Sequence, residues 1–189
     1  MQLTEAIKTR QSIKKFSDKK ADWRKIVQAI DSARYTPMAG NNFSLKFILV
    51  RNVEKIEKLK AACQQDFVKT PYVIVVVSDY NKVKKLYGKN GETFGKQQAG
   101  AAINNILLTL TNFGLDSCWV GYFSEKLVKS ALKISDNFTV EALIPVGYRH
   151  KGYSHKIALK TELENILFFD SWKNKKMSEE FRVSDLPTE

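Results

Sequence analysis

The stretch PYVIVVVSD, residues 71–79, constrains the fold more than any other part of the sequence. Its apolar residues follow one another without a break, whereas a strand with one face in water alternates apolar and polar residues. The run is bounded by Pro71 on one side and a polar Ser-Asp pair on the other. It therefore predicts a strand that is buried on both of its faces.

Helices and a second strand are predicted before this run. Residues 22–35 have helical apolar spacing, with Asp22 as the N-cap and Pro37 beyond the end. Residues 46–52 are β-branched and apolar, which indicates a buried strand. Residues 53–67 place apolar residues on one side and Lys and Glu on the other, which predicts an amphipathic helix.

A long apolar helix is predicted over residues 96–114, where Gly114 ends it. It is too apolar for a surface helix, so we expect it to cross the middle of the fold. A short helix over residues 124–134, with Ser124 as its N-cap, and a buried strand over residues 139–148 complete the pattern.

Length and composition fit one domain with a sizeable core, because the chain has 189 residues and 43% hydrophobic content. No apolar run of about 18 residues and no apolar signal core is present, which favours a cytoplasmic protein without membrane contact. Cys63 and Cys118 form no CxxC or Cys/His cluster. We therefore expect no metal site, and we interpret both cysteines as small buried apolar residues.

The formal net charge is +11, from 31 Lys and Arg against 20 Asp and Glu. Such a charge suits a polyanion, so a nucleic-acid-binding module is one alternative. The lysines are scattered, however, and no basic helix carries them with interleaved aromatic residues. We favour a lysine-biased surface without a nucleic-acid partner, with attraction to anionic small molecules as a second possibility.

Near the N-terminus, IKTRQSIKKF places Arg10, Ser12 and Lys14 at alternate positions. In an extended segment this alternation puts the three side chains on one side. Two cations and a hydroxyl facing one way suit an anion, above all a phosphate. A solvated basic turn is the alternative that these residues leave open.

Several catalytic patterns are absent. There is no GxxxxGK(S/T) loop, no GxGxxG after a strand and no nucleophile elbow. His150 and His155 are not spaced as metal ligands on one helix face. Side chains that could act as acids, bases or nucleophiles are therefore few, which points to a bound cofactor as the source of any chemistry.

Five stretches in order resemble the nitroreductase family of FMN-dependent oxidoreductases: IKTRQSIKKF, IDSARYTPMAGNNFSLKFILV, TPYVIVVVSD, QAGAAINNILLTLTNFGLDSCWVGYF and VEALIPVGY. The resemblance runs from Ile7 to about Trp172. It implies an α+β sandwich with a central, mostly antiparallel sheet flanked by helices. We accordingly expect one FMN-binding domain over residues 1–172 and a polar tail over residues 173–189.

The resemblance also implies an obligate homodimer with FMN in two clefts at the interface. Helix 96–114 would form the core of the dimer. The C-terminal segment would cross to the other subunit and add a strand to its sheet. This exchange would bury ILFFDSW, which is more apolar than a free tail.

The N-terminal residues match the family's first FMN motif. By resemblance, Arg10 and Ser12 would hold phosphate and ribityl oxygens, and Lys14 would lie near the pyrimidine side of the ring. Gln11 would add backbone and amide contacts. Asn41 matches an Asn that the family contributes across the dimer interface, although an ordinary turn residue is the alternative.

Further along, Gln65 matches a polar residue beside the isoalloxazine ring, and Gly121 and Tyr122 match the loop that faces flavin N5. Lys160, with Lys156 as the alternative, matches the cation that grips the phosphate. No residue of the chain is assigned a catalytic role, because flavin N5 carries the chemistry.

Some stretches depart from the family or stay ambiguous. Residues 37–45 read PMAGNNFSL where the family reads Pro-Ser-x-x-Asn-x-Gln-Pro-Trp, which puts the usual substrate pocket in doubt. Gln97 and Gln98 stand where an acidic residue often occurs. The glycine-rich stretch GKNGETFG, which Tyr87 and Phe94 mark, is either part of a substrate channel or a mobile exposed loop.

The resemblance implies transfer of electrons from NADH or NADPH through FMN to a small nitroaromatic or quinone acceptor. Since both substrates would use one site in turn, it predicts ping-pong kinetics. The alternative is a flavin-binding protein, or a specialised flavin dehydrogenase, without NAD(P)H-driven turnover.

Overall fold

The computed structural model describes residues 1–63, 67, 70–153 and 161–177. The chain divides into two compact units, Met1–Tyr153 and Ser154–Glu189. Each unit is described by itself. The boundary expected near residue 172 stays a prediction.

The first unit is built on a four-stranded sheet in the order β1-β2-β4-β3. Its strands are β1 (Leu45–Val50), β2 (Tyr72–Ser78), β3 (Asp116–Ser117) and β4 (Thr139–Gly147). Every pairing between neighbours is antiparallel. The predicted α+β fold with a central antiparallel sheet is confirmed, and β2, the strand with the continuous apolar run, lies inside the sheet between β1 and β4.

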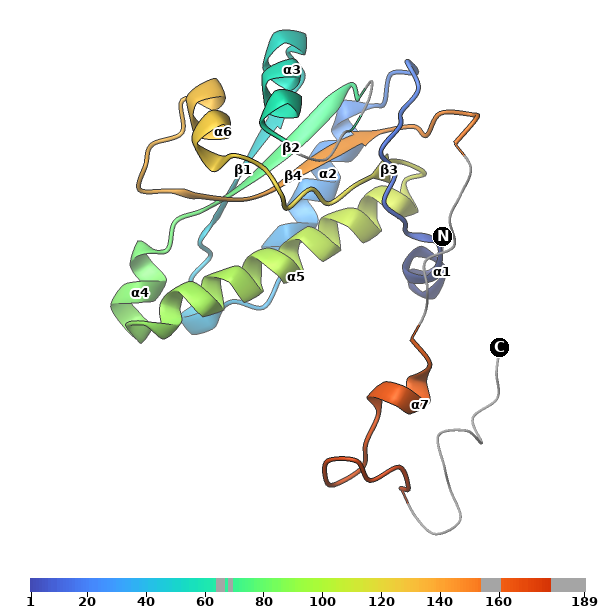
Figure 1. Ribbon diagram of the computed structural model, residues 1–189, viewed down its shortest axis with the longest axis vertical. Coiled ribbons are helices and arrows are strands. Elements are labelled where there is room, and N and C mark those ends of the chain that lie inside the picture. The colour runs from blue at the N-terminus through green and yellow to red at the C-terminus, as the bar shows by residue number, and fades with distance from the viewer. Residues whose placement is uncertain (64–66, 68–69, 154–160, 178–189) are drawn as a thin grey trace. The chain divides into compact units, whose positions relative to one another are not determined.

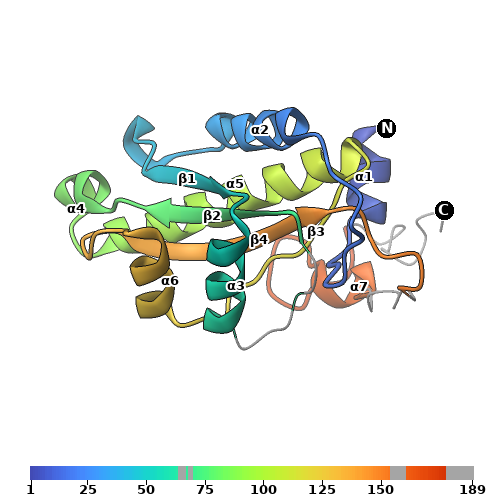
Figure 2. The same cartoon turned by 90° about the horizontal axis from the view of Figure 1, so that it is seen from above.

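Two layers of helices cover the sheet. Figure 2 shows α2 (Trp23–Asp31) and α5 (Asn90–Asn112) on one side and α3 (Val53–Ala62) and α6 (Glu125–Leu132) on the other. Alternate residues of β2 enter the two apolar clusters that result: Ile74 and Val76 face α2 and α5, while Val73, Val75 and Val77 face α3 and α6. The unbroken apolar run is thus explained, because both faces of the strand are covered.

The predicted helix ends were partly right. Asp22 caps α2 by accepting a hydrogen bond from the N–H of Arg24 at 3.0 Å. The chain then continues as the 3₁₀ turn η1 (Ser32–Tyr35) before Pro37. Helix α3 ends earlier than predicted, at Ala62, and Ser124 precedes α6 without a side-chain capping bond.

Helix α5 begins at Asn90, six positions before its predicted start, so the interpretation of GKNGETFG as a loop is wrong. Two glycines explain the difference. A Cβ on Gly91 would lie 2.6 Å from the backbone of Lys84 in α4 (Asn81–Tyr87), and one on Gly95 would lie 2.3 Å from the ring of Tyr80. The glycines therefore allow α4 and α5 to pack closely rather than making the chain mobile.

The C-terminal end of α5 and its outer face complete the description of this helix. Gly114 has a φ of +72°, and the N–H of Leu115 returns to the carbonyl of Leu110 at 2.9 Å, which is a Schellman-type end. The predicted stop at Gly114 is confirmed. Ala101 and Asn104 are exposed in the single chain, so one side of α5 is not covered by the described residues.

The second unit contains the short helix α7 (Leu163–Ile166) and a compact turn. The rings of Phe168 and Trp172 lie 4.7 Å apart, and the ammonium of Lys175 lies 4.0 Å from the centre of the Phe168 ring. Ile166 is 63% exposed and Trp172 78% exposed. The apolar character of this segment is therefore not satisfied in the single chain.

Among the described residues, no helix combines the length and the apolar character needed to cross a lipid bilayer. The same residues hold no group of three or more His, Cys, Asp or Glu side chains placed to bind a metal ion.

Candidate functional site

The segment of residues 10–16 is held along the edge of the sheet beside β3. Helix α1 (Leu3–Thr9) leads directly into it. The N–H of Ile13 donates to the carbonyl of Ser117 at 2.9 Å, and the carbonyl of Lys15 accepts from the N–H of His150 at 3.0 Å. Ile13 and Phe16 are fully buried and anchor the segment. Its backbone is fixed at two points, so its exposed side chains keep a defined direction.

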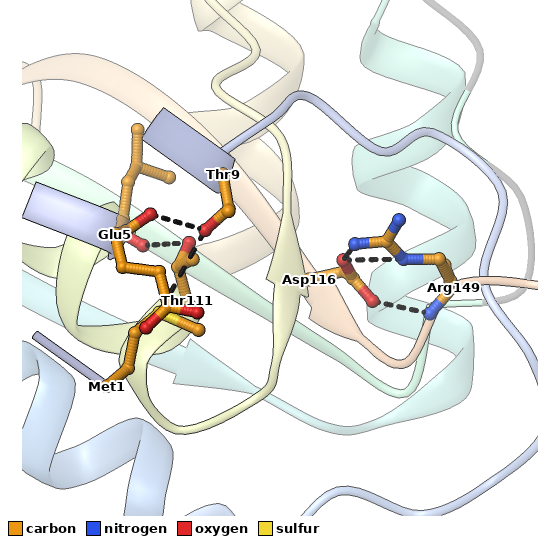
Figure 3. A network of polar contacts seen from close by, with 7 residues as sticks. Met1, Glu5, Thr9, Thr111, Asp116 and Arg149 are labelled. Carbon is orange, nitrogen blue, oxygen red and sulfur yellow. Dashed lines mark hydrogen bonds and ion pairs between the residues drawn. The ribbon is translucent and has the colours of Figure 1, made fainter. Parts of the chain in front are cut away.

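An ion pair between Asp116 and Arg149 stabilises the part of the sheet to which residues 10–16 are attached (Figure 3). The carboxylate of Asp116 accepts from the backbone N–H of Arg149 at 2.9 Å and from its guanidinium at 3.0 and 2.7 Å. Behind it, a Cβ on Gly147 would lie 3.1 Å from the ring of Phe16, so the strand and the segment approach closely. The clamp ties the end of β4 to β3. No local pattern in the sequence predicts this ion pair.

The row of Arg10, Ser12 and Lys14 lies near the buried residue Cys118, because Ser12 forms a β-bridge with Ser117, the preceding residue. Burial raises the pKa of the Cys118 thiol, while a hydrogen bond with Ser12 and the charges of Lys14 and Arg10 lower it in part. Ile13, which lies between Ser12 and Lys14, is buried, so the burial pattern agrees with the predicted alternation at these two residues. Ser12 and Lys14 are exposed and Arg10 is half-buried.

The two cations of this row are not neutralised within the described part of the chain. Neither Arg10 nor Lys14 forms an ion pair there. Between them, Oε1 of Gln11 is buried and accepts no hydrogen bond from the described residues. The segment thus holds two available positive charges, a hydroxyl and an unused amide oxygen.

Gly121 and Tyr122 form a second exposed strip, which follows the buried residues Cys118 and Val120. The chain runs beside β4 as far as Val120, which exchanges two hydrogen bonds with Leu143 at 2.9 and 3.0 Å. A bridge between Phe123 and Cys63 fixes the far end. A Cβ on Gly121 would meet only Nε1 of Trp119, at 3.8 Å. The backbone at Gly121 therefore has open space over it, which a flat group could use.

Asn41 is placed elsewhere in the single chain. It ends the 3₁₀ turn η2 (Ala39–Asn41) with a φ of +54°. Gln98 of α5 holds this turn, because its Oε1 accepts the N–H of Ser44 at 3.0 Å and its Nε2 donates to the carbonyl of Asn42 at 3.2 Å. A residue that looked like a departure from the family pattern, Gln98, thus supports the turn.

The separation between Asn41 and Arg10 follows from the length of α5. Helix α1, which leads into Arg10, lies against the C-terminal half of α5, where Ala6 lines a small hollow with Leu108 and Asn112. Roughly 20 Å of helix separates Gln98 from Asn112. The structure therefore brings Arg10, Ser12 and Lys14 together but not Asn41 with them.

The other predicted contacts cannot be placed. Gln65, Lys156 and Lys160 lie outside the described residues. Of the two cysteines, Cys118 is buried as predicted, whereas Cys63 is half-buried, and burial raises the pKa of its thiol to about 11.

The donor set suits a cofactor that has a phosphate at one end and a flat ring at the other. A guanidinium, a hydroxyl and an ammonium can bind phosphate and polar oxygens. The open backbone at Gly121 leaves room for a ring. These residues therefore fit FMN.

The comparison with known proteins identifies the family. The family described as Nitroreductase matches residues 7–71 and 59–148, so the chain belongs to the nitroreductase family. A protein of Methanothermobacter thermautotrophicus, provisionally named NADH dehydrogenase/NAD(P)H nitroreductase, is 30% identical over 153 residues, which cover 78% of each chain.

Solved structures show the same fold. A nitroreductase family protein of Clostridium novyi NT is 29% identical, with a TM-score of 0.73 over 92% of this chain and 96% of that one. An FMN-dependent nitroreductase of Clostridium difficile R20291 is 22% identical, with a TM-score of 0.74 over 88% of this chain and 98% of that one. At this identity the second likeness supports the fold alone.

Proposed function

We propose that this chain is an FMN-dependent oxidoreductase that passes electrons from NADH or NADPH to a small organic acceptor of the nitroaromatic or quinone class. The observation that carries the proposal is the row of Arg10, Ser12 and Lys14 on a backbone fixed by hydrogen bonds at Ile13 and Lys15, with both cations unpaired among the described residues. Such a row suits a phosphate and a ring that becomes negatively charged on reduction.

In this proposal, Arg10 and Ser12 hold the phosphate and ribityl oxygens of FMN, and Lys14 lies at the pyrimidine side of the ring. Gln11 offers its unused Oε1, and the backbone of Gly121 and Tyr122 faces the ring. Bound FMN supplies the electron transfer between the nicotinamide and the acceptor. The positive charge of Lys14 stabilises negative charge at the ring, while the fixed backbone of the segment keeps that charge in position.

We further propose a homodimer in which each site takes residues from two chains. Asn41 lies far from Arg10 within one chain, so it would serve the site of the partner. Strand β1 is at the edge of the sheet, and among the described residues no strand pairs with its outer side. It can therefore accept a strand from the second unit of another copy. That exchange would cover Ile166 and Trp172 and would bring Lys160 or Lys156 to the phosphate.

The choice of NAD(P)H as electron donor is supported by the name of the archaeal relative, which includes NAD(P)H nitroreductase. If the acceptor follows the nicotinamide into the same site, the two substrates react in turn and the kinetics are ping-pong.

The purified protein tests the proposal directly. We expect it to show the visible absorption bands of oxidised flavin, and to lose them when NADH or NADPH is added without oxygen. Steady-state rates with a quinone should then give parallel double-reciprocal plots. A yellow protein that neither nicotinamide reduces would be a flavin-binding protein or a specialised dehydrogenase. A colourless protein that binds duplex DNA with a steep salt dependence would overturn the proposal.

A further inference from the structure

Helices α3 and α6 lie side by side on the face of the sheet opposite α5 (Figure 1) and form a groove between them. Their inward side chains, including Leu59 and Val128, are fully buried in the core. Above these residues, the outer flanks of both helices line a hollow of about 550 Å³. The groove is therefore a surface feature on top of a packed layer.

Cations from both helices border this groove. Lys55 and Lys58 line it from α3 and Lys133 lines it from the C-cap of α6, with Glu54 as the one carboxylate among its lining residues. A second hollow of about 580 Å³ on the other side of α6 shares Lys133 and adds Lys126. Glu125 and Asp136 also line this second hollow, so the excess of positive charge is greater at the α3–α6 groove.

The lysines that border the two hollows differ from neighbouring lysines in their ion pairing. Lys60 pairs with Glu57 at 3.8 Å, and Lys129 pairs with Glu125 at 2.9 Å. Lys55, Lys58, Lys126 and Lys133 form no ion pair in the part of the chain that the structure describes. Their charges therefore remain available to a partner.

The groove between these charges is apolar and contains small side chains. Ala61 of α3 and Ala131 of α6 line it, together with Leu127, which is 52% exposed. A groove between two helices that has small apolar residues and a charged rim suits a third, amphipathic helix. Its lining includes no aromatic residue on which a nucleic-acid base could stack.

The groove ends beside the candidate site. The N–H of Ser124, just before α6, donates to the carbonyl of Ala62 at the end of α3 at 2.8 Å. Phe123 bridges Cys63 at the same place. Gly121 and Tyr122 directly precede this junction, so a partner seated in the groove would lie next to the exposed strip.

We propose that the α3–α6 groove is a docking site for an acidic amphipathic helix of a partner protein. Carboxylates on the edges of that helix would pair with Lys55, Lys58 and Lys133, and its apolar stripe would cover Leu127. Complementary charge sets the rate and the specificity of such an association more than its area does. The inference does not depend on flavin binding.

The test uses the full chain and a fluorescent peptide about five turns long, with leucines at helical spacing on one face and glutamates on the other. Fluorescence anisotropy at low ionic strength gives its Kd. The test variant is Lys55→Glu/Lys58→Glu. The matched control is Lys82→Glu/Lys85→Glu on α4, which has the same spacing and the same change in charge. Circular dichroism and thermal melting check that both variants are folded.

We expect the α3 variant to weaken peptide binding by about tenfold or more and the α4 variant by less than about twofold. Leu127→Asn should weaken it as well, because the apolar contact is lost. Equal losses in both double variants would mean diffuse attraction to a basic protein and would overturn the proposal. So would absence of measurable peptide binding, or tighter binding of duplex DNA or phosphatidylglycerol vesicles through the same lysines.

Discussion

Residues 10–16 and the corner between α4 and α5 are both rich in cations, but they use them in opposite ways. In the corner, Glu92 pairs with Lys84 at 2.9 Å and with Lys96 at 2.8 Å. In the N-terminal segment, Arg10 and Lys14 have no such partner among the described residues. Lysine content alone therefore does not mark a site. What distinguishes the segment from Lys84 and Lys96 is that its cations have no carboxylate partner among the described residues and lie beside the unused Oε1 of Gln11.

The corner also shows how tightly a region that looks flexible in sequence can be built. Tyr80 is buried and donates a hydrogen bond to Glu141, and burial together with this bond raises the pKa of its hydroxyl. The ring of Tyr80 lies against Gly95, and α4 lies against Gly91. Gly91 and Gly95 of the corner are packing residues, whereas Gly121 has open space over it.

The largest expected effect is on stability, and it separates the closely packed Gly91 from the open Gly121. Gly91→Ala should destabilise the protein by about 2 kcal/mol, because the new Cβ would overlap the backbone of α4. Helix propensity alone would favour alanine by about 1 kcal/mol. The sign of the change in the free energy of unfolding therefore shows whether close packing or helix propensity dominates at Gly91. Gly121→Ala should alter stability by no more than about 0.5 kcal/mol. Urea unfolding of both variants measures this, and a stabilised Gly91→Ala would contradict the close packing.

A comparison of Lys14 with its neighbour Lys15 tests the role of the Arg10, Ser12 and Lys14 row. Lys14→Glu should weaken FMN binding by about tenfold or more, because it places a negative charge at the pyrimidine side of the proposed ring. Lys15→Glu should change it by less than about twofold, since Lys15 holds the segment through its carbonyl, not its side chain. Titration of the apoprotein, followed by quenching of FMN fluorescence, gives both values. If Lys14→Glu stays yellow and equally active, the assignment is wrong.

The smallest effect concerns the ion pairs of the corner. Hydrogen bonds with Lys96 and Lys84, and then their charges, lower the pKa of Glu92 to about 2. A lowered pKa in the folded state adds stability above the ordinary pKa of a carboxyl, and this stability is lost as the pH falls toward 2. Glu92→Gln should therefore lower Tm slightly at pH 6, and the difference should shrink in acid. A difference that is independent of pH would point to packing instead.

The sequence predicted the features that depend on local pattern. The unbroken apolar run located β2, and the alternation in residues 10–14 agrees with the exposure of Ser12 and Lys14 on either side of the buried Ile13, because each pattern follows directly from strand geometry. The early start of α5 was not predictable in this way. Glycine has low helix propensity, and the reason for Gly91 and Gly95 lies in α4, which packs against them.

The candidate site was only partly predictable for a similar reason. The bridge between Ser12 and Ser117 and the ion pair between Asp116 and Arg149 join residues that are far apart in sequence, and no local period reveals such contacts. The distance between Asn41 and Arg10 depends on the length of α5 and on which ends of it their neighbours contact. Sequence order alone does not contain that information.

The position of β2 inside the sheet has a consequence for the chain as it is made. Its pairing with β1 forms between neighbours in sequence, but β4 is synthesised about 60 residues after β2. Until β4 arrives, the growing chain holds an apolar strand with one unpaired edge, and such edges promote aggregation. The edge of β2 therefore stays exposed in the nascent protein until residue 147 has been synthesised. The burial of β2 inside the sheet is completed late.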